Sequence, residues 1–188
     1  AARILAREAA AAGIERLLDA ETLAGLRARA AFAATAAPDA GIPALGAETI
    51  AAAITAAAHG LISLDELRRA PLQQALEAHL APHRALLDRL APAQVSLGGR
   101  RRVAVHYEPD RPPWIASRMQ DFFGLSRGPT VADGQVPLVL HLLAPNQRPV
   151  QVTTDLAGFW VRHYPALRRE LMRRYPRHAW PEDPTSGA

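Results

Sequence analysis

The stretch from Val136 to Leu143, VPLVLHLL, is nearly continuous in apolar residues. An apolar run of this length predicts a β-strand that is covered on both faces. Asn146-Gln147-Arg148 then turns the chain into a second stretch, Val150 to Thr154, whose alternation of apolar and polar residues also predicts a strand. We therefore expect the second half of the chain to be organised around a sheet.

A β-hairpin is predicted upstream of these strands. Residues 94 to 97 and 101 to 108 have a period of two and are separated by Gly98-Gly99, which predicts a tight turn between antiparallel strands. The alternation places two sets of side chains on opposite sides of the hairpin: Val103, Val105 and Tyr107 on one, and Arg102, Ala104, His106 and Glu108 on the other.

Three helices are predicted in the same half. The first is expected over about 112 to 124, where three apolar residues recur at helical spacing: Ile115, Met119 and Phe122. Asp155 is placed to cap the second, and Pro165 starts the third, which has an apolar stripe opposite its arginines. The order of elements predicts an α+β fold in which helices pack on a small antiparallel β-sheet.

The first half of the chain is rich in alanine and is predicted to be helical throughout. A helix capped by Asp19 is expected to run to about Ala36, and another from Glu48 to about His59. Ser63-Leu64-Asp65-Glu66 has the pattern of a capping box, in which Ser63 and Glu66 satisfy each other's backbone donors. Pro71 and Pro82 each fit the first turn of a helix, so two short helices are expected after the box. The predicted domains are residues 1–92, helical, and residues 93–188, α+β.

Charge divides the chain at the same place. All 22 basic residues are arginine. Residues 1–92 hold 9 arginines and 10 acidic residues, whereas residues 93–188 hold 13 and 8, so the second half carries a net charge of +5. Arginine binds phosphates through a bidentate fork, which makes nucleic acid a candidate partner of the second half.

Several classes of site and location are excluded or disfavoured by what the sequence lacks. It has no cysteine, which excludes disulfides and thiolate metal sites. It has no phosphate-loop or G-x-G-x-x-G motif, and no nucleophile is spaced convincingly near His141, which we interpret as a hydrogen-bonded core histidine. We therefore predict no catalytic, cofactor-binding or metal-binding residue in this chain. No apolar run approaches the roughly 20 residues of a membrane span, so a cytoplasmic location is expected.

The candidate contacts to nucleic acid are arginines of the hairpin and of the last two helices, with one histidine. Arginines at i and i+4 on a helix can meet successive phosphates, although a solvated surface is the alternative for both clusters. Trp160, Tyr164 and Tyr175 could stack bases, but their spacing favours core packing. We interpret Trp180, among prolines, as an anchor that holds the tail on its own domain. The predicted nucleic-acid-binding residues are Arg100, Arg101, Arg102, His106, Arg162, Arg168, Arg169, Arg173, Arg174 and Arg177.

Longer stretches resemble a known family. RPVQVTTDLAGFW (148–160), YPALRRELMRRYPRHAWPEDP (164–184), GRRRVAVHYEPDRPPWIASRMQDFFGL (99–125) and GQVPLVLHLLAPNQRPVQVT (134–153) are similar, in order and spacing, to the C-terminal region of bacterial HrpB-type ATP-dependent helicases of the DEAH-box class. LDELRRAPLQQALEAHL (64–80) resembles the helical segment that precedes it. The start Ala1-Ala2-Arg3, without methionine, suggests that the chain is a piece of a longer protein.

The resemblance implies a cytoplasmic motor that acts on RNA or other single-stranded nucleic acid. Its RecA-like domains would bind ATP and Mg, carry the phosphate loop and Asp-Glu-Ala-His box, and be partners of this chain. No motor motif occurs in this sequence, so no ATPase residue is carried over. We expect an accessory module that binds or guides single-stranded nucleic acid through arginine–phosphate contacts. The alternative is a structural or regulatory module that docks on the helicase core or on a protein partner.

Overall fold

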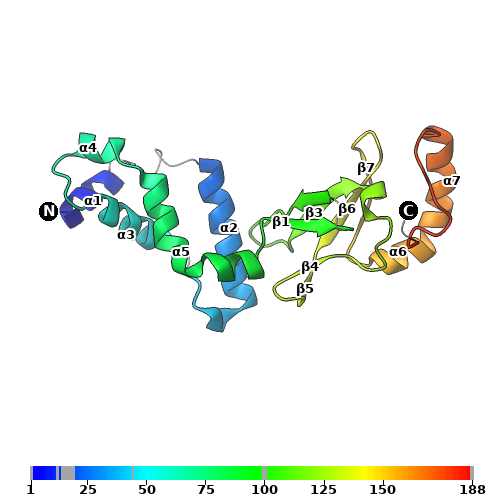
Figure 1. The fold of residues 1–188 in the computed structure, drawn as a ribbon, viewed down its shortest axis with the longest axis horizontal. Helices are drawn as coiled ribbons and strands as arrows, with labels where there is room; N and C mark the ends of the chain where they lie inside the picture. Colours follow the sequence, from blue (N-terminus) through cyan, green and yellow to red (C-terminus); the bar gives the residue numbers. More distant parts are fainter. Residues whose placement is uncertain (1, 12, 14–19, 44, 99–100, 187–188) are drawn as a thin grey trace. The chain divides into compact units, whose positions relative to one another are not determined.

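The computed structural model describes residues 2–11, 13, 20–43, 45–98 and 101–186. The chain divides into two compact units, residues 1–91 and residues 92–188 (Figure 1). The first unit is helical and the second is built on small sheets, which confirms the predicted α+β class.

The helices of the first unit pack mainly through leucine and alanine. They are α1 (Ala2–Ala11), α2 (Ala20–Ala36), α3 (Ala47–Ala57), α4 (Leu64–Arg69) and α5 (Leu72–Leu90), with a short 3-10 helix at Pro38–Ala40. α5 packs against α2 and α3, and α1 packs against α3. The predicted cap Asp19 lies outside the described residues. Fully buried alanines such as Ala9, Ala33 and Ala58 allow these backbones to approach closely.

The prediction of two short helices after Pro71 is wrong, because α5 continues through Pro82. A proline inside a helix removes one backbone hydrogen bond and crowds the preceding turn. Pro82 is exposed, however, and α5 has buried leucines both before and after it in the sequence. The burial of this continuous apolar stripe outweighs the local cost of the proline. The buried leucines of α5 are Leu72, Leu76, Leu80, Leu87 and Leu90.

The predicted cap of α4 is largely confirmed. The Ser63 hydroxyl accepts a hydrogen bond from the Glu66 backbone N–H at 3.2 Å. The Glu66 carboxylate accepts from the backbone N–H of Ile62 at 2.9 Å, one residue before the position expected for a capping box. Two donors at the start of the helix are thus satisfied locally.

The second unit begins with the predicted hairpin. β1 (Gln94–Leu97) pairs antiparallel with β2 (Arg101–Ala104), with Val95 opposite Val103. Leu97, Val103 and Val105 are buried, whereas Arg102, Ala104 and His106 are exposed, so the predicted alternation is confirmed. A second small antiparallel pair is formed by β4 (Thr130–Val131) and β5 (Val136–Pro137).

The central sheet has three strands in the order β3-β6-β7 (Figure 1). β6 (Val139–Leu143) pairs antiparallel with β7 (Pro149–Thr153), which agrees with the two strands expected on either side of Asn146-Gln147-Arg148. Its other neighbour is β3 (Trp114–Arg118), which runs parallel to it and was not predicted. The sheet is therefore mixed, with one parallel and one antiparallel pair.

The helix predicted over about 112 to 124 is wrong, because this segment forms β3 followed by a 3-10 helix at Met119–Phe122. Ile115, Met119 and Phe122 are all fully buried, so the segment's apolar residues were identified correctly but their period was not. Ser117, buried between Ile115 and Met119, reveals the true period of two. Hydrogen bonds to β6 decide the conformation of this segment, and the pattern of residues within the segment does not show that β6 is its partner.

The two faces of this sheet differ. On one face Ile115, Leu140 and Leu142 are fully buried. On the other face Trp114, Val139 and His141 are only half-buried, and Val152 is 49% exposed. The expectation that the apolar strand is covered on both faces is therefore wrong within the second unit. We call the half-buried side the open face.

Candidate nucleic-acid interface

The last two helices present most of the predicted contacts, and a side-chain cap fixes the first of them. α6 (Leu156–Arg162) begins after Asp155, whose carboxylate accepts a hydrogen bond from the Gly158 backbone N–H at 2.8 Å. The predicted cap is thereby confirmed. The Gly158 hydrogen bond and then Arg162 hold the pKa of Asp155 below its usual value, because both stabilise the charged carboxylate.

Arg162 is already paired. Its guanidinium donates to Asp155 at 2.7 Å, across the backbone of Gly158. A Cβ on Gly158 would lie 1.9 Å from the Asp155 carboxylate and 2.1 Å from the Arg162 guanidinium, so only glycine leaves room for this pair. The pair is exposed, and such a contact contributes little to stability, so Arg162 can exchange it for a phosphate.

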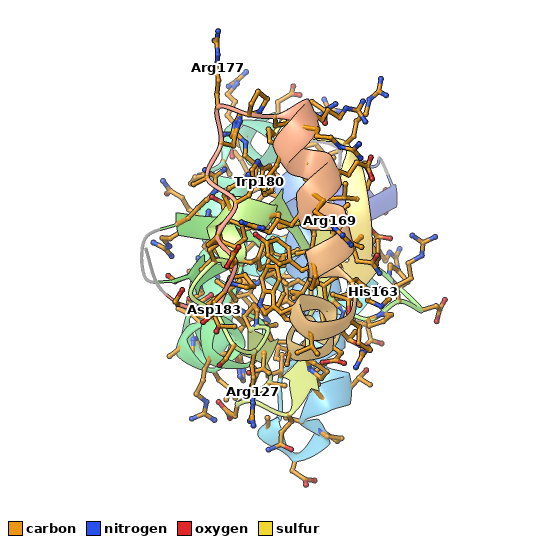
Figure 2. The ribbon with its side chains drawn as sticks, turned by 90° about the vertical axis from the view of Figure 1, so that its right-hand side faces the viewer. Arg127, His163, Arg169, Arg177, Trp180 and Asp183 are labelled. Carbon is orange, nitrogen blue, oxygen red and sulfur yellow. The ribbon has the colours of Figure 1, made fainter. Side chains whose placement is uncertain are left out.

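The last helix, α7 (Tyr164–Arg174), has the predicted division into a packed side and an arginine side. Tyr164 and Leu171 are buried, and Leu167 and Tyr175 are half-buried. The exposed arginines form what we call the arginine surface: Arg169, Arg173, Arg174 and Arg177. In Figure 2, Arg177 stands at the turn after α7 and points away from the protein.

Arg168 has a different role from its neighbours. Its Nε donates to the Trp180 carbonyl at 2.8 Å, and its guanidinium lies 3.8 Å from the Glu182 carboxylate. Its side chain is only 22% exposed, in contrast to the arginine surface. Arg168 thus binds the chain's own tail, and we leave it out of the proposed phosphate contacts.

The tail after Tyr175 is held against its own unit. Trp180 is buried and donates from its indole N–H to the Tyr175 carbonyl at 3.1 Å. The Tyr164 hydroxyl donates to the Pro181 carbonyl at 2.8 Å, and the Gly124 N–H donates to the Pro184 carbonyl at 2.8 Å. Figure 2 shows the tail running back alongside α7, with Trp180 between the two. The expected anchor is therefore present.

The aromatic residues of α6 and α7 belong to the core. Trp160 is buried and donates to the Leu125 carbonyl at 2.8 Å, and its ring meets the Tyr164 ring edge-on at 5.2 Å. Burial raises the pKa of Tyr164 to about 12. These contacts favour core packing over base stacking for both residues, as the apolar spacing indicated.

The hairpin arginines are dispersed. Arg100 lies outside the described residues. Arg101 is exposed and lies 3.2 Å from the Asp121 carboxylate, whereas Arg102 is exposed on the same side of the hairpin as His106. In the described part of the chain, no group of three or more histidine, aspartate or glutamate side chains could hold a metal ion. The described helices also include none that is long and apolar enough to cross a membrane.

His106 is part of a stack of rings that the sequence did not reveal. Its imidazole lies 3.9 Å from the Trp114 ring at an interplanar angle of 14°. The Trp114 ring also stacks on His141, at 4.7 Å and 29°. The interpretation of His141 as a core histidine is not supported, because His141 is half-buried and stacks on Trp114. Trp114 was missed because its segment was predicted as a helix, and only strand pairing brings these rings together.

Comparison with known proteins identifies the group to which this architecture belongs. Residues 54–184 match the family model described as the ATP-dependent helicase C-terminal domain. The chain belongs to this family. The resemblance to HrpB-type helicases noted in the sequence is thereby confirmed.

Relatives of this helicase C-terminal part include the ATP-dependent RNA helicase HrpB of Escherichia coli strain K12, which is 40% identical over 168 residues, or 87% of this chain and 21% of that protein. A crystal structure of the E. coli DExH-box NTPase HrpB matches with a TM-score of 0.79 and 39% identity, over 91% of this chain and 22% of that one. A structure of the E. coli DEAH/RHA helicase HrpB matches with a TM-score of 0.64 and 38% identity, over 83% and 20%. The chain spans about a fifth of the length of these relatives.

Proposed function

We propose that this chain is the accessory C-terminal part of an ATP-dependent RNA helicase and binds single-stranded nucleic acid by arginine–phosphate contacts. ATP and Mg would act in motor domains of the same protein, in the cytoplasm. The observation that carries the proposal is the arginine surface. Its four side chains are exposed, and α7 carries a single acidic residue, Glu170.

The geometry of the arginine surface suits a phosphate backbone. Arg169 and Arg173 are four residues apart on α7, which places their Cβ atoms about 5–6 Å apart on one face of a helix. Two such side chains can contact neighbouring phosphates of one strand. Arg174 and Arg177 extend the positive charge past the C-terminal end of α7. The helix dipole at this end stabilises the arginines and does not itself attract a phosphate. Binding would thus depend on the guanidinium groups and not on the backbone.

Contacts of this kind position a strand without reading its sequence. Each neutralised phosphate of a single strand contributes about −0.7 to the slope of log K against log salt concentration. We therefore expect fluorescence anisotropy with a labelled oligouridine to show salt-dependent binding, and the double variant Arg169→Ala/Arg173→Ala to lower the slope by about 1.4. Binding that ignores salt, or a double variant that binds as tightly as the parent chain, would overturn the proposal.

A matched control is available in the same unit. Arg127 is also exposed, and Figure 2 places it at the opposite end of the unit from Arg177. Arg127→Ala changes the net charge by the same amount as Arg173→Ala. We expect Arg173→Ala to reduce the salt slope by about 0.7 and Arg127→Ala to leave it nearly unchanged. Equal effects of the two would indicate non-specific attraction to the whole basic unit.

A docking function is the second candidate, and two exposed apolar side chains favour it. Val161 on α6 is 77% exposed and Met172 on α7 is 42% exposed. Exposed apolar groups beside arginines are common at protein interfaces. The test is calorimetric titration of the chain with the motor part of a HrpB-type helicase, using the parent chain and a Val161→Asp/Met172→Asp variant. Binding that the variant loses would support docking, and absence of binding would contradict it.

A further inference from the structure

The open face of the central sheet carries a row of rings that crosses the strands. The reciprocal backbone hydrogen bonds between His106 and Trp114, at 2.8 and 3.1 Å, pair the extension of β2 with β3. His141 lies on the next strand, two residues beyond Val139, the partner of Trp114, and it pairs with Val152 of β7. His106, Trp114, His141 and Val152 thus follow one another diagonally across the sheet, and the Trp114 ring stacks between the two imidazoles.

The row is built and partly accessible. The Trp114 indole N–H donates to the Glu108 carboxylate at 3.0 Å, and Glu108 is itself 3.3 Å from the Arg111 guanidinium. These contacts orient the indole and neutralise the nearby carboxylate. His106 and Val152, at the two ends of the row, are exposed. A planar ligand can therefore stack on His106 at one end of the row or pack against Val152 at the other.

The surrounding charges select the ligand. Arg102 shares the side of the hairpin with His106, and Arg118 shares the open face with Trp114; both are exposed. Each is four residues along an extended chain from its ring, or about 13 Å. Positive charges that flank a stack of rings match a chain of flat bases joined by phosphates. A stacked duplex has its bases covered and would not present them to this face.

From this geometry we propose that the row His106–Trp114–His141 stacks an unpaired base of the bound strand. This inference rests on the proposed nucleic-acid function and deepens it, because it names a site that would recognise accessible bases and not only phosphates. The arginine surface would hold phosphates of any strand. The open face would then give the unit a preference for single-stranded over duplex nucleic acid.

The test compares the full 188-residue chain on three probes: an oligouridine, an abasic strand of the same length and charge, and a duplex. Base stacking on an aromatic side chain strengthens binding between about 5-fold and about 150-fold per base. We expect the oligouridine to bind more tightly than the abasic strand by a factor in this range, and Trp114→Ala to remove the difference. Since Trp160 and Trp180 are buried, quenching of tryptophan fluorescence by the oligouridine should also depend on Trp114.

His106→Ala keeps the test valid if Trp114→Ala impairs folding, because His106 is exposed. His163, also exposed and placed between α6 and α7, provides the matched control. We expect His106→Ala to reduce the preference for the oligouridine over the abasic strand and His163→Ala to preserve it. Equal, salt-dependent binding of oligouridine and abasic strand would overturn the stacking proposal alone. Absence of binding to any probe would overturn the proposed function as well.

Discussion

Replacing Trp180 by alanine should destabilise the second unit strongly. Trp180 is buried, with an exposed fraction of 6%. A buried tryptophan takes about 200 Å² out of water, which at roughly 25 cal/mol per Å² sets an upper value of about 5 kcal/mol. The substitution also removes the hydrogen bond from the indole to Tyr175. We expect the free energy of unfolding to fall by about 3–5 kcal/mol.

A loss of this size is a large part of the stability of the second unit, whose 97 residues give an expected total of about 5–15 kcal/mol. The assay is urea unfolding followed by tryptophan fluorescence. All three tryptophans, at positions 114, 160 and 180, lie in the second unit, so the signal reports this unit and not the alanine-rich one. Trp114 and Trp160 remain as probes in the variant.

Arg177→Ala provides the control from the same tail. Arg177 is exposed, so its replacement should change the free energy of unfolding by less than about 0.5 kcal/mol. If Trp180→Ala costs less than about 1 kcal/mol, or no more than Arg177→Ala, then the tail is not an anchor and the reasoning fails. The docked tail also accepts hydrogen bonds from Arg168 and Tyr164 at the Trp180 and Pro181 carbonyls, which Trp180→Ala leaves in place.

Three further predictions concern single positions. Pro82→Ala should stabilise the first unit by about 1–2 kcal/mol, since alanine restores a backbone donor inside α5, and a lower thermal midpoint would contradict this. The pKa of Asp155 is lowered in the folded protein. Its charge therefore contributes to the free energy of unfolding above the ordinary pKa of 3.8, and this contribution is lost as the pH falls through the lower folded pKa. Acid titrations of the unfolding midpoint should therefore show a loss that is smaller in Asp155→Asn, which keeps the cap acceptor. The pKa of Tyr164 is raised from 10.0 to about 12, so its contribution to the free energy of unfolding is complete below pH 10 and is lost between these two values. Tyrosinate absorbance and unfolding at alkaline pH, each compared with Tyr164→Phe, check this.

Local signals in the sequence predicted their structures well. Asp155 caps α6, Ser63 caps α4, and β1 pairs antiparallel with β2, because each of these features depends on residues a few positions apart. The charge division also follows from the sequence alone. It indicated an arginine side on the last helix, and the exposure of Arg169 and Arg173 confirms that side as an exposed surface. The contact of these arginines with nucleic acid stays a prediction.

The sequence alone determined the helical first half, the apolar strand around Leu140, and the basic last helix, because periodicity and capping are properties of neighbouring residues. Contacts between distant segments decided the rest. Only the tertiary structure paired β3 with β6 and thereby brought Trp114 between His106 and His141. Only the folded tail, whose Trp180 carbonyl accepts a hydrogen bond from Arg168, distinguishes this residue from the exposed arginines beside it. Each of these arrangements depends on which distant segment supplies the hydrogen-bond partner, and no pattern within a single segment specifies that partner.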